Sequence, residues 1–91
     1  MKTFIAVAKF KSEATQEDIQ KLIPAEQAQA KILQDAGSLG FIKVAMPQRT
    51  VFLEVFAESF EEATEVVHSL PLIVLWDVEL FETTPPAGVQ P

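Results

Sequence analysis

The chain lacks cysteine entirely and holds only one histidine and one tryptophan among its 91 residues. Without cysteine, disulfide bonds, thiolate catalysis and cysteine-ligated metal sites are excluded. The lone histidine, His68, can assemble neither a metal-binding cluster nor a Ser-His-Asp or Cys-His arrangement, and we interpret it as a helix-end or surface residue. The three glycines match no phosphate-binding fingerprint. The sequence therefore predicts no metal site and no cofactor.

Positive charge is also scarce, with seven Lys and Arg residues against 13 Asp and Glu and a net charge of −6. Because phosphate binding depends on clustered Lys and Arg, this balance predicts neither a nucleic-acid partner nor binding to an anionic membrane surface. Long apolar runs are missing too, since no segment approaches the roughly 20 apolar residues that span a bilayer. Lys9 and Lys11 interrupt the apolar start of the chain, which favours a strand over a signal peptide, and the expected compartment is the cytoplasm.

What the chain does contain is enough apolar sequence for one small core, because 48% of its residues are hydrophobic. That content predicts a single globular domain and argues against disorder. We place the domain at residues 1–83 and an extended, proline-rich tail at residues 84–91, which is expected to reach a neighbouring subunit. A core of this size contributes little surplus stability, so self-association is expected.

The first half of the chain predicts a strand followed by helical sequence. The strand covers residues 2–10, and a helix begins after Thr15, where Asp18 three residues later gives a variant of the capping box. Proline pushes the residue before it away from helical angles, so we expect a break or kink at Pro24. A second helical piece over residues 25–36 then follows.

The second half predicts a hairpin, a helix and a last strand. Residues 39–46 and 50–57 form the hairpin, in which a two-residue connection places Val44 opposite Val51 and Ile42 opposite Leu53. Ser59 caps the second helix, and the last strand runs from about 73 to 82. The order β-α-β-β-α-β is the ferredoxin-like α+β pattern, an antiparallel sheet with both helices on one face. Right-handed crossovers place the first strand beside the third and the fourth strand on the first strand's other side.

The sheet face away from the helices is expected to carry Phe52, Phe56, Leu75 and Phe81. Leaving that much apolar surface bare is unusual for a soluble monomer. We therefore expect a dimer, or a larger assembly of dimers, packed sheet to sheet.

The same face gathers the residues of a candidate ligand site, namely Lys43, Phe52, Glu54, Phe56 and Asp77. An aromatic-lined cavity that holds a few ionisable groups is typical of a small-ligand site, and carboxylates there can have pKa values raised by desolvation. A structural alternative stays open, because Lys43 and Glu54 are diagonal neighbours that suit a partly exposed ion pair, and Asp77 suits a sheet edge.

Two segments of the chain resemble the muconolactone isomerase family. The first runs from Glu26 through Leu33-Gln34 to Gly37, and the second joins Ser69-Leu70-Pro71-Leu72 to the strand that carries Asp77. The resemblance implies ferredoxin-like chains that form dimeric α+β barrels and assemble further, into decamers in the enzymes that name the family. It also implies a cofactor-free proton shift on a small unsaturated, carboxylated lactone in the breakdown of aromatic compounds.

Glu26 is the residue that the resemblance assigns as the catalytic base, with Lys43 orienting the anionic substrate. On spacing alone, Glu26 suits a solvated helix position equally well. Two other functions stay open: a non-enzymatic domain that binds a small ligand or assembles a complex, and a cofactor-independent monooxygenase on the same barrel. A buried Glu26 or Glu54 with a raised pKa favours an enzyme, whereas fully solvated carboxylates favour the assembly domain.

Overall fold

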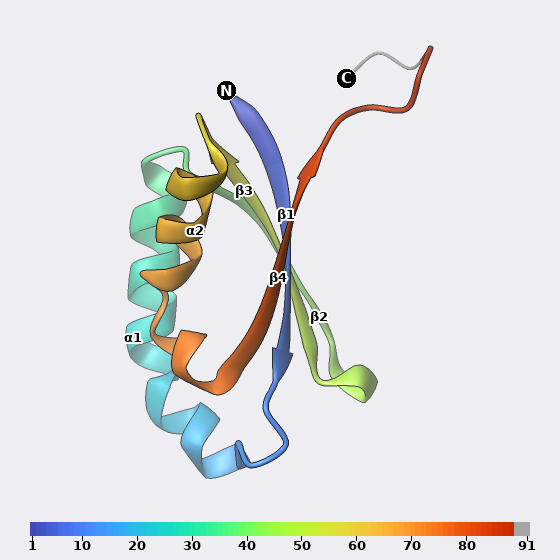
Figure 1. Ribbon diagram of the computed structural model, residues 1–91. Helices are drawn as coiled ribbons and strands as arrows, with labels where there is room; N and C mark the ends of the chain where they lie inside the picture. Colours follow the sequence, from blue (N-terminus) through green and yellow to red (C-terminus); the bar gives the residue numbers. More distant parts are fainter. Residues whose placement is uncertain (89–91) are drawn as a thin grey trace.

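Four antiparallel strands form one sheet in the order β2-β3-β1-β4, and two α-helices cover one of its faces (Figure 1). The computed structural model describes residues 1–88. The predicted ferredoxin-like α+β class and strand order are confirmed. The elements are β1 (Lys2–Phe10), α1 (Gln16–Asp35), β2 (Leu39–Ala45), the 3₁₀ turn η1 (Met46–Gln48), β3 (Thr50–Ala57), α2 (Phe60–His68), the 3₁₀ turn η2 (Pro71–Leu75) and β4 (Trp76–Thr83).

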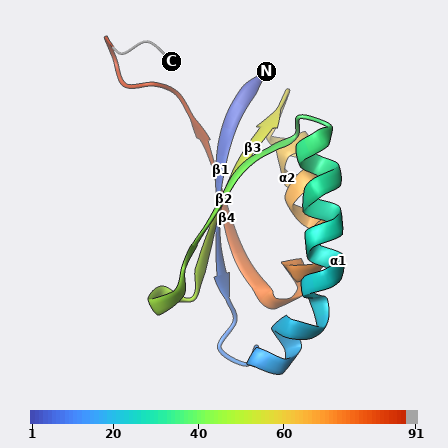
Figure 2. The same ribbon diagram turned by 180° about the vertical axis from the view of Figure 1, so that it is seen from behind.

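The core lies between the sheet and the two helices. Alternation along β1 buries Phe4, Ala6 and Ala8 on the helix side and leaves Ile5 and Val7 on the other. The view from behind shows both helices on one side of the sheet and the opposite face uncovered (Figure 2). In the described part of the chain, no helix is long and apolar enough to cross a membrane.

The helix α1 is continuous through Pro24, so of the predicted break or kink the break does not occur. Thr15 Oγ1 accepts the Asp18 N–H at 3.1 Å and the Asp18 carboxylate accepts the Thr15 N–H at 3.0 Å, which confirms the capping box. Proline costs one helical hydrogen bond, but the packing of an apolar stripe can outweigh that loss. The stripe comprises Ile19, Leu22, Ile23, Ala30 and Leu33. Figure 1 shows the first turns of α1 set at an angle to the rest, so a bend takes the place of the break.

The hairpin turn holds Arg49 in the left-handed region, with φ of 50°. The expected register is confirmed, because Val44 lies opposite Val51 and Ile42 opposite Leu53. A non-glycine residue in this conformation is uncommon. Arg49 Nη2 donates to two backbone carbonyls of the β1–α1 loop, those of Lys11 at 3.2 Å and Ala14 at 2.8 Å. These two hydrogen bonds join the hairpin turn to that loop and offset the backbone cost.

The last strand is shorter than predicted, because residues 71–75 form the 3₁₀ turn η2 and β4 begins only at Trp76. Pro71 at the start of a helical turn is the physical reason, since its fixed φ suits the first helical position. Leu75 therefore lies in η2 and not on the open face of the sheet, so that expectation is wrong. Trp76, Val78 and Leu80 face the helices, opposite Phe10, Ala8 and Ala6 of β1.

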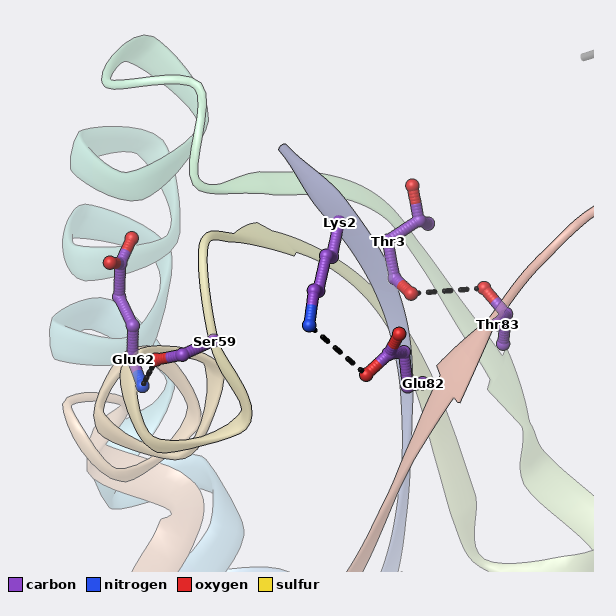
Figure 3. Close-up of polar contacts among 6 residues, drawn as sticks. All are labelled: Lys2, Thr3, Ser59, Glu62, Glu82 and Thr83. Atoms are coloured by element: carbon purple, nitrogen blue, oxygen red, sulfur yellow. Dashed lines mark hydrogen bonds and ion pairs between the residues drawn. The ribbon is translucent and has the colours of Figure 1, made fainter.

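Polar contacts fasten the end of the sheet where β4 stops (Figure 3). Thr83 Oγ1 donates to the Thr3 carbonyl at 3.1 Å, and Lys2 Nζ lies 3.8 Å from a Glu82 carboxylate oxygen. Nearby, Ser59 Oγ accepts the Glu62 N–H at 3.1 Å and so caps α2. Residues 84–88 continue beyond the sheet as an exposed segment, and residues 89–91 lie outside the described residues. The predicted role of the tail in a neighbouring subunit therefore stays a prediction.

Candidate functional site

Glu26 lies half-buried on α1, where this helix packs against η2. Its Oε1 atom accepts the Leu72 N–H at 2.9 Å. Leu72 is near the start of η2, where backbone N–H groups have no partner within the turn. Leu70 is the N-cap residue of η2, and in the described structure its side chain makes no capping hydrogen bond. The Glu26 carboxylate supplies that cap from α1.

A second contact reinforces the packing of α1 on this segment. Gln29 Nε2 donates to Ser69 Oγ at 3.1 Å, and Ser69 Oγ in turn donates to the Val66 carbonyl at 2.7 Å. Glu26 and Gln29 are three residues apart and so share one face of the helix. The two segments that carry the family resemblance, one on α1 and one at Ser69-Leu70-Pro71-Leu72, therefore contact each other directly.

Burial raises the pKa of Glu26 above its ordinary value, while the hydrogen bond from Leu72 N–H acts in the opposite direction. Desolvation disfavours the charged carboxylate, whereas a backbone donor favours it, and here desolvation is the larger effect. A carboxyl group with a raised pKa exchanges protons closer to neutral pH, which is the property required of a general acid or base. Glu26 is thus held in place by a hydrogen bond, and its carboxyl group has a raised pKa.

The predicted substrate-binding residues of the hairpin do gather on the open face. Lys43 of β2 lies opposite Phe52 of β3, and Glu54 and Phe56 follow on the same face. Glu54 Oε1 accepts the Phe41 N–H at 3.3 Å, and Lys43 Nζ lies 5.3 Å from the centroid of the Phe41 ring. In the part of the chain that the structure describes, no ion pair joins Lys43 to Glu54.

Gly40 leaves the space that the Glu54 carboxylate occupies. A Cβ atom at position 40 would overlap Glu54 Oε1 and press on the Phe56 ring. The register of β2 against β3 shifts between Leu39 and Ile42, which is the sign of a β-bulge at this point. The bulge turns the Phe41 N–H toward the open face, where Glu54 accepts it.

Asp77 lies apart from this group. It is on β4, opposite Lys9 of β1, whereas Lys43 is on β2 at the other edge of the sheet. Three strand spacings separate the two edges, about 14 Å. Asp77 shares the open face with Lys43 and Glu54, as expected, but does not adjoin them within one protomer.

Glu26 and the five predicted binding residues lie on opposite sides of the sheet. The helix layer carries Glu26, and the open face carries Lys43, Phe52, Glu54, Phe56 and Asp77. A ligand that contacts Glu26 in one protomer therefore cannot contact Lys43 of the same protomer. The role of each residue stays a prediction.

Two residues that the sequence did not single out for a site have unusual surroundings. Arg49 is described above, and its one sequence signal is its place in a proline-containing hairpin turn. Trp76 is buried against Phe10, with ring centroids 6.1 Å apart, and its Nε1 is buried without a hydrogen-bond partner among the described residues.

His68 ends α2 as an exposed residue, and it lines a small hollow with Val78 and Leu80.

Comparison with known proteins finds a shared fold and no close sequence relative. No protein-family model matches the chain, and no curated protein matches it. Among solved structures, a crystal structure of muconolactone isomerase superposes with a TM-score of 0.73 at 17% sequence identity, covering 100% of this chain and 97% of that one. The full-length superposition shows that the chain has the ferredoxin-like fold of that enzyme.

Proposed function

We propose that this chain, which has the fold of muconolactone isomerase, is itself a cofactor-independent isomerase that moves a proton within a small unsaturated lactone. The supporting observation is the Glu26 carboxyl group, which is half-buried and accepts the Leu72 N–H. Burial raises the pKa of this carboxyl group. It lies where the two segments that carry the family resemblance meet. Glu26 is the proposed base.

The chemistry requires only one carboxyl group that accepts a proton and gives it back. Glu26 removes a proton from the carbon next to the lactone carbonyl, and the electron pair of that C–H bond spreads into the carbonyl as an enolate. The same carboxyl then returns the proton to a different carbon, which moves the double bond without any external oxidant or reductant. Oε1 accepts the Leu72 N–H, and within residues 1–88 no hydrogen bond engages Oε2. Oε2 is therefore the proposed proton-transfer atom.

A hydrogen-exchange assay tests this proposal. The wild-type protein is incubated with an unsaturated lactone in deuterated buffer, and deuterium incorporation and double-bond migration are followed by NMR. Glu26→Gln keeps an oxygen that can accept the Leu72 N–H but cannot take up a proton at neutral pH, so we expect exchange to fall by at least roughly a hundredfold. Gln29→Ala is the control, because it removes the neighbouring contact with Ser69 and leaves the carboxyl group in place. Equal exchange by the wild type and Glu26→Gln would overturn the assignment.

A second function, an assembly or small-ligand-binding domain without catalysis, is favoured by a different observation. The Glu26 carboxylate already caps η2, so its burial has a structural purpose. The open sheet face also presents aromatic side chains, with Phe41 37% and Phe81 49% exposed. A wild-type protein that is stable, self-associated and without exchange activity on any lactone would support this second function.

We also propose that the open face mediates self-association. Its apolar residues lie on all four strands, and the helices cover only the other face. Burial of such a face against a second copy removes the apolar surface from water.

A further inference from the structure

A hollow of about 450 Å³ lies between the start of α1 and the hairpin turn, on the helix side of the sheet. Its apolar walls come from three elements: Phe10 from β1, Ile19 from α1, and Val44 with Met46 from the hairpin. A volume of this size suits a small organic molecule, and an apolar lining with few polar groups is usual for such sites. Val44 and Met46 are 54% and 71% exposed, so the hollow is accessible to a ligand.

Arg49 is the one positively charged side chain that lines this hollow. Its Nη2 atom is bound to the Lys11 and Ala14 carbonyls, which fixes the plane of the guanidinium group. Among residues 1–88, no hydrogen bond engages its Nη1 or Nε, and no carboxylate lies within ion-pair distance of it. This lack of an acidic partner is notable in a chain with 13 acidic residues.

We propose that this hollow binds a small monocarboxylate with an apolar or aromatic body. The Nη1 group of the guanidinium offers charged N–H donors to a carboxylate, and the side chains of Phe10, Ile19, Val44 and Met46 contact the apolar body. A single fixed cation among apolar walls suits one negative charge better than the two charges of a phosphate monoester.

The inference goes beyond the proposed function, because the hollow and Glu26 are separate places. Glu26 lies seven residues beyond Ile19 on α1, about 10 Å along the helix axis. A small ligand beside Arg49 therefore does not contact the Glu26 carboxyl group. Binding at the hollow and proton exchange at Glu26 are measured separately, so the failure of one leaves the other standing.

The test is an NMR titration of the ¹⁵N-labelled full chain with benzoate, with benzamide as the neutral probe of the same shape. We expect benzoate to shift the amide signals of residues around the hollow, such as Ile19, Val44 and Met46. Benzamide carries no negative charge and loses the charged hydrogen bonds, so we expect its affinity to be at least roughly tenfold lower than that of benzoate. Equal affinity for the two probes would overturn the proposal, as would benzoate shifts confined to another part of the molecule.

Substitutions separate the role of Arg49 from general charge effects. Arg49→Gly suits the positive φ at this position and removes the guanidinium, so benzoate affinity should fall to that of benzamide. Lys9→Gln removes another exposed cation, which lies on β1 on the opposite face of the sheet, and should leave benzoate affinity unchanged. An equal loss in both variants would show diffuse attraction and overturn the site.

A second pair of variants serves if Arg49→Gly does not fold. Val44→Glu places a carboxylate in the hollow at an exposed position, and we expect it to weaken benzoate binding by at least roughly tenfold through repulsion. Ile42→Glu is the matched control, since Ile42 is on the same strand and face but does not line the hollow. Benzoate affinity that is unchanged in Val44→Glu, or lowered equally in Ile42→Glu, would overturn the proposal.

Discussion

At the scale of single residues, the Glu26 carboxylate matters first as a hydrogen-bond acceptor. Glu26→Ala leaves the Leu72 N–H at the start of η2 without its partner, and we expect the free energy of unfolding to fall by about 1–3 kcal/mol. Glu26→Gln retains an acceptor oxygen, so we expect a loss of less than about 1 kcal/mol. Urea denaturation at neutral pH measures both. If the alanine variant is as stable as the glutamine variant, the cap on η2 contributes little.

The raised pKa of Glu26 gives a separate prediction for the pH dependence of stability. Because the folded-state pKa lies above the unfolded-state value, the unfolded chain loses this proton first as pH rises. The contribution of Glu26 to stability is therefore fully present below the unfolded-state pKa and declines as pH rises through the folded-state pKa. Glu26→Gln has no group that titrates there, so we expect the stability of the wild type to fall relative to that of Glu26→Gln as pH rises through this window.

Urea unfolding of both proteins over about pH 4 to 8 measures that difference, since ordinary glutamate pKa values lie near the lower limit. Glu65→Gln, at an exposed position on α2, is the control and should follow the wild type. A wild type that instead gains stability over Glu26→Gln with rising pH would mean that the Leu72 hydrogen bond outweighs desolvation.

At the scale of elements, α1 tolerates a proline in its interior. Pro24 is exposed and cannot donate to the carbonyl four residues earlier, so Pro24→Ala restores a hydrogen bond and removes a steric clash. We expect the free energy of unfolding to rise by about 1–3 kcal/mol. Gln27→Ala, an exposed change on the same helix, should alter stability by less than about 0.5 kcal/mol. Denaturant unfolding compares the two variants.

The opposite outcome for Pro24→Ala would be informative in itself. The bend of α1 precedes the turns that carry Glu26 and Gln29, which contact η2 and Ser69. If a straight helix can no longer reach these partners, the alanine variant loses stability. The bend would then be a requirement of the packing between α1 and η2.

The same elements show what local sequence patterns can and cannot predict. Alternation along the hairpin strands predicted their register, with Val44 opposite Val51, because side-chain direction in a strand has a period of two. The sequence wrongly allowed for a break at Pro24 and wrongly predicted a strand that begins soon after Pro71. A proline is compatible with a helix interior or a helix start when tertiary contacts compensate. Local sequence patterns do not indicate those tertiary contacts.

Local sequence patterns likewise predicted only part of the candidate site. The open-face residues Lys43, Phe52 and Glu54 could be grouped because one hairpin holds them. The partner of Glu26 is 46 residues away, at Leu72, and nothing in the spacing of either segment indicates which side of the sheet the pair occupies. The Arg49 contacts to Lys11 and Ala14 likewise join segments that only the folded chain brings together.

At the scale of the whole molecule, the two faces of the sheet are unequal. The helix side buries the core, which includes Phe4, Leu53 and Val55. The open side presents Ile5, Val7, Phe52 and Phe56 in partly buried positions across the two central strands. On this side Asp77 and Glu79 lie at the β4 edge and Lys43 lies at the β2 edge, whereas Glu54 lies on the central strand β3. The Glu54 carboxylate accepts the Phe41 N–H, and around it the face has a mainly apolar centre and a charged rim, as many protein interfaces do.

This arrangement predicts that an added charge without a hydrogen-bond partner at the centre of the open face prevents self-association. Phe52 lies between Lys43 and Val7 in the sheet, so Phe52→Glu places a carboxylate where a second copy would have to desolvate it. We expect the wild type to sediment as a dimer or larger assembly and Phe52→Glu as a monomer. Val74→Glu is the matched control, because Val74 is a 64% exposed apolar residue of η2, away from the open face. Sedimentation equilibrium distinguishes the cases: a monomeric wild type, or a control that also dissociates, would mean that the open face is not the interface.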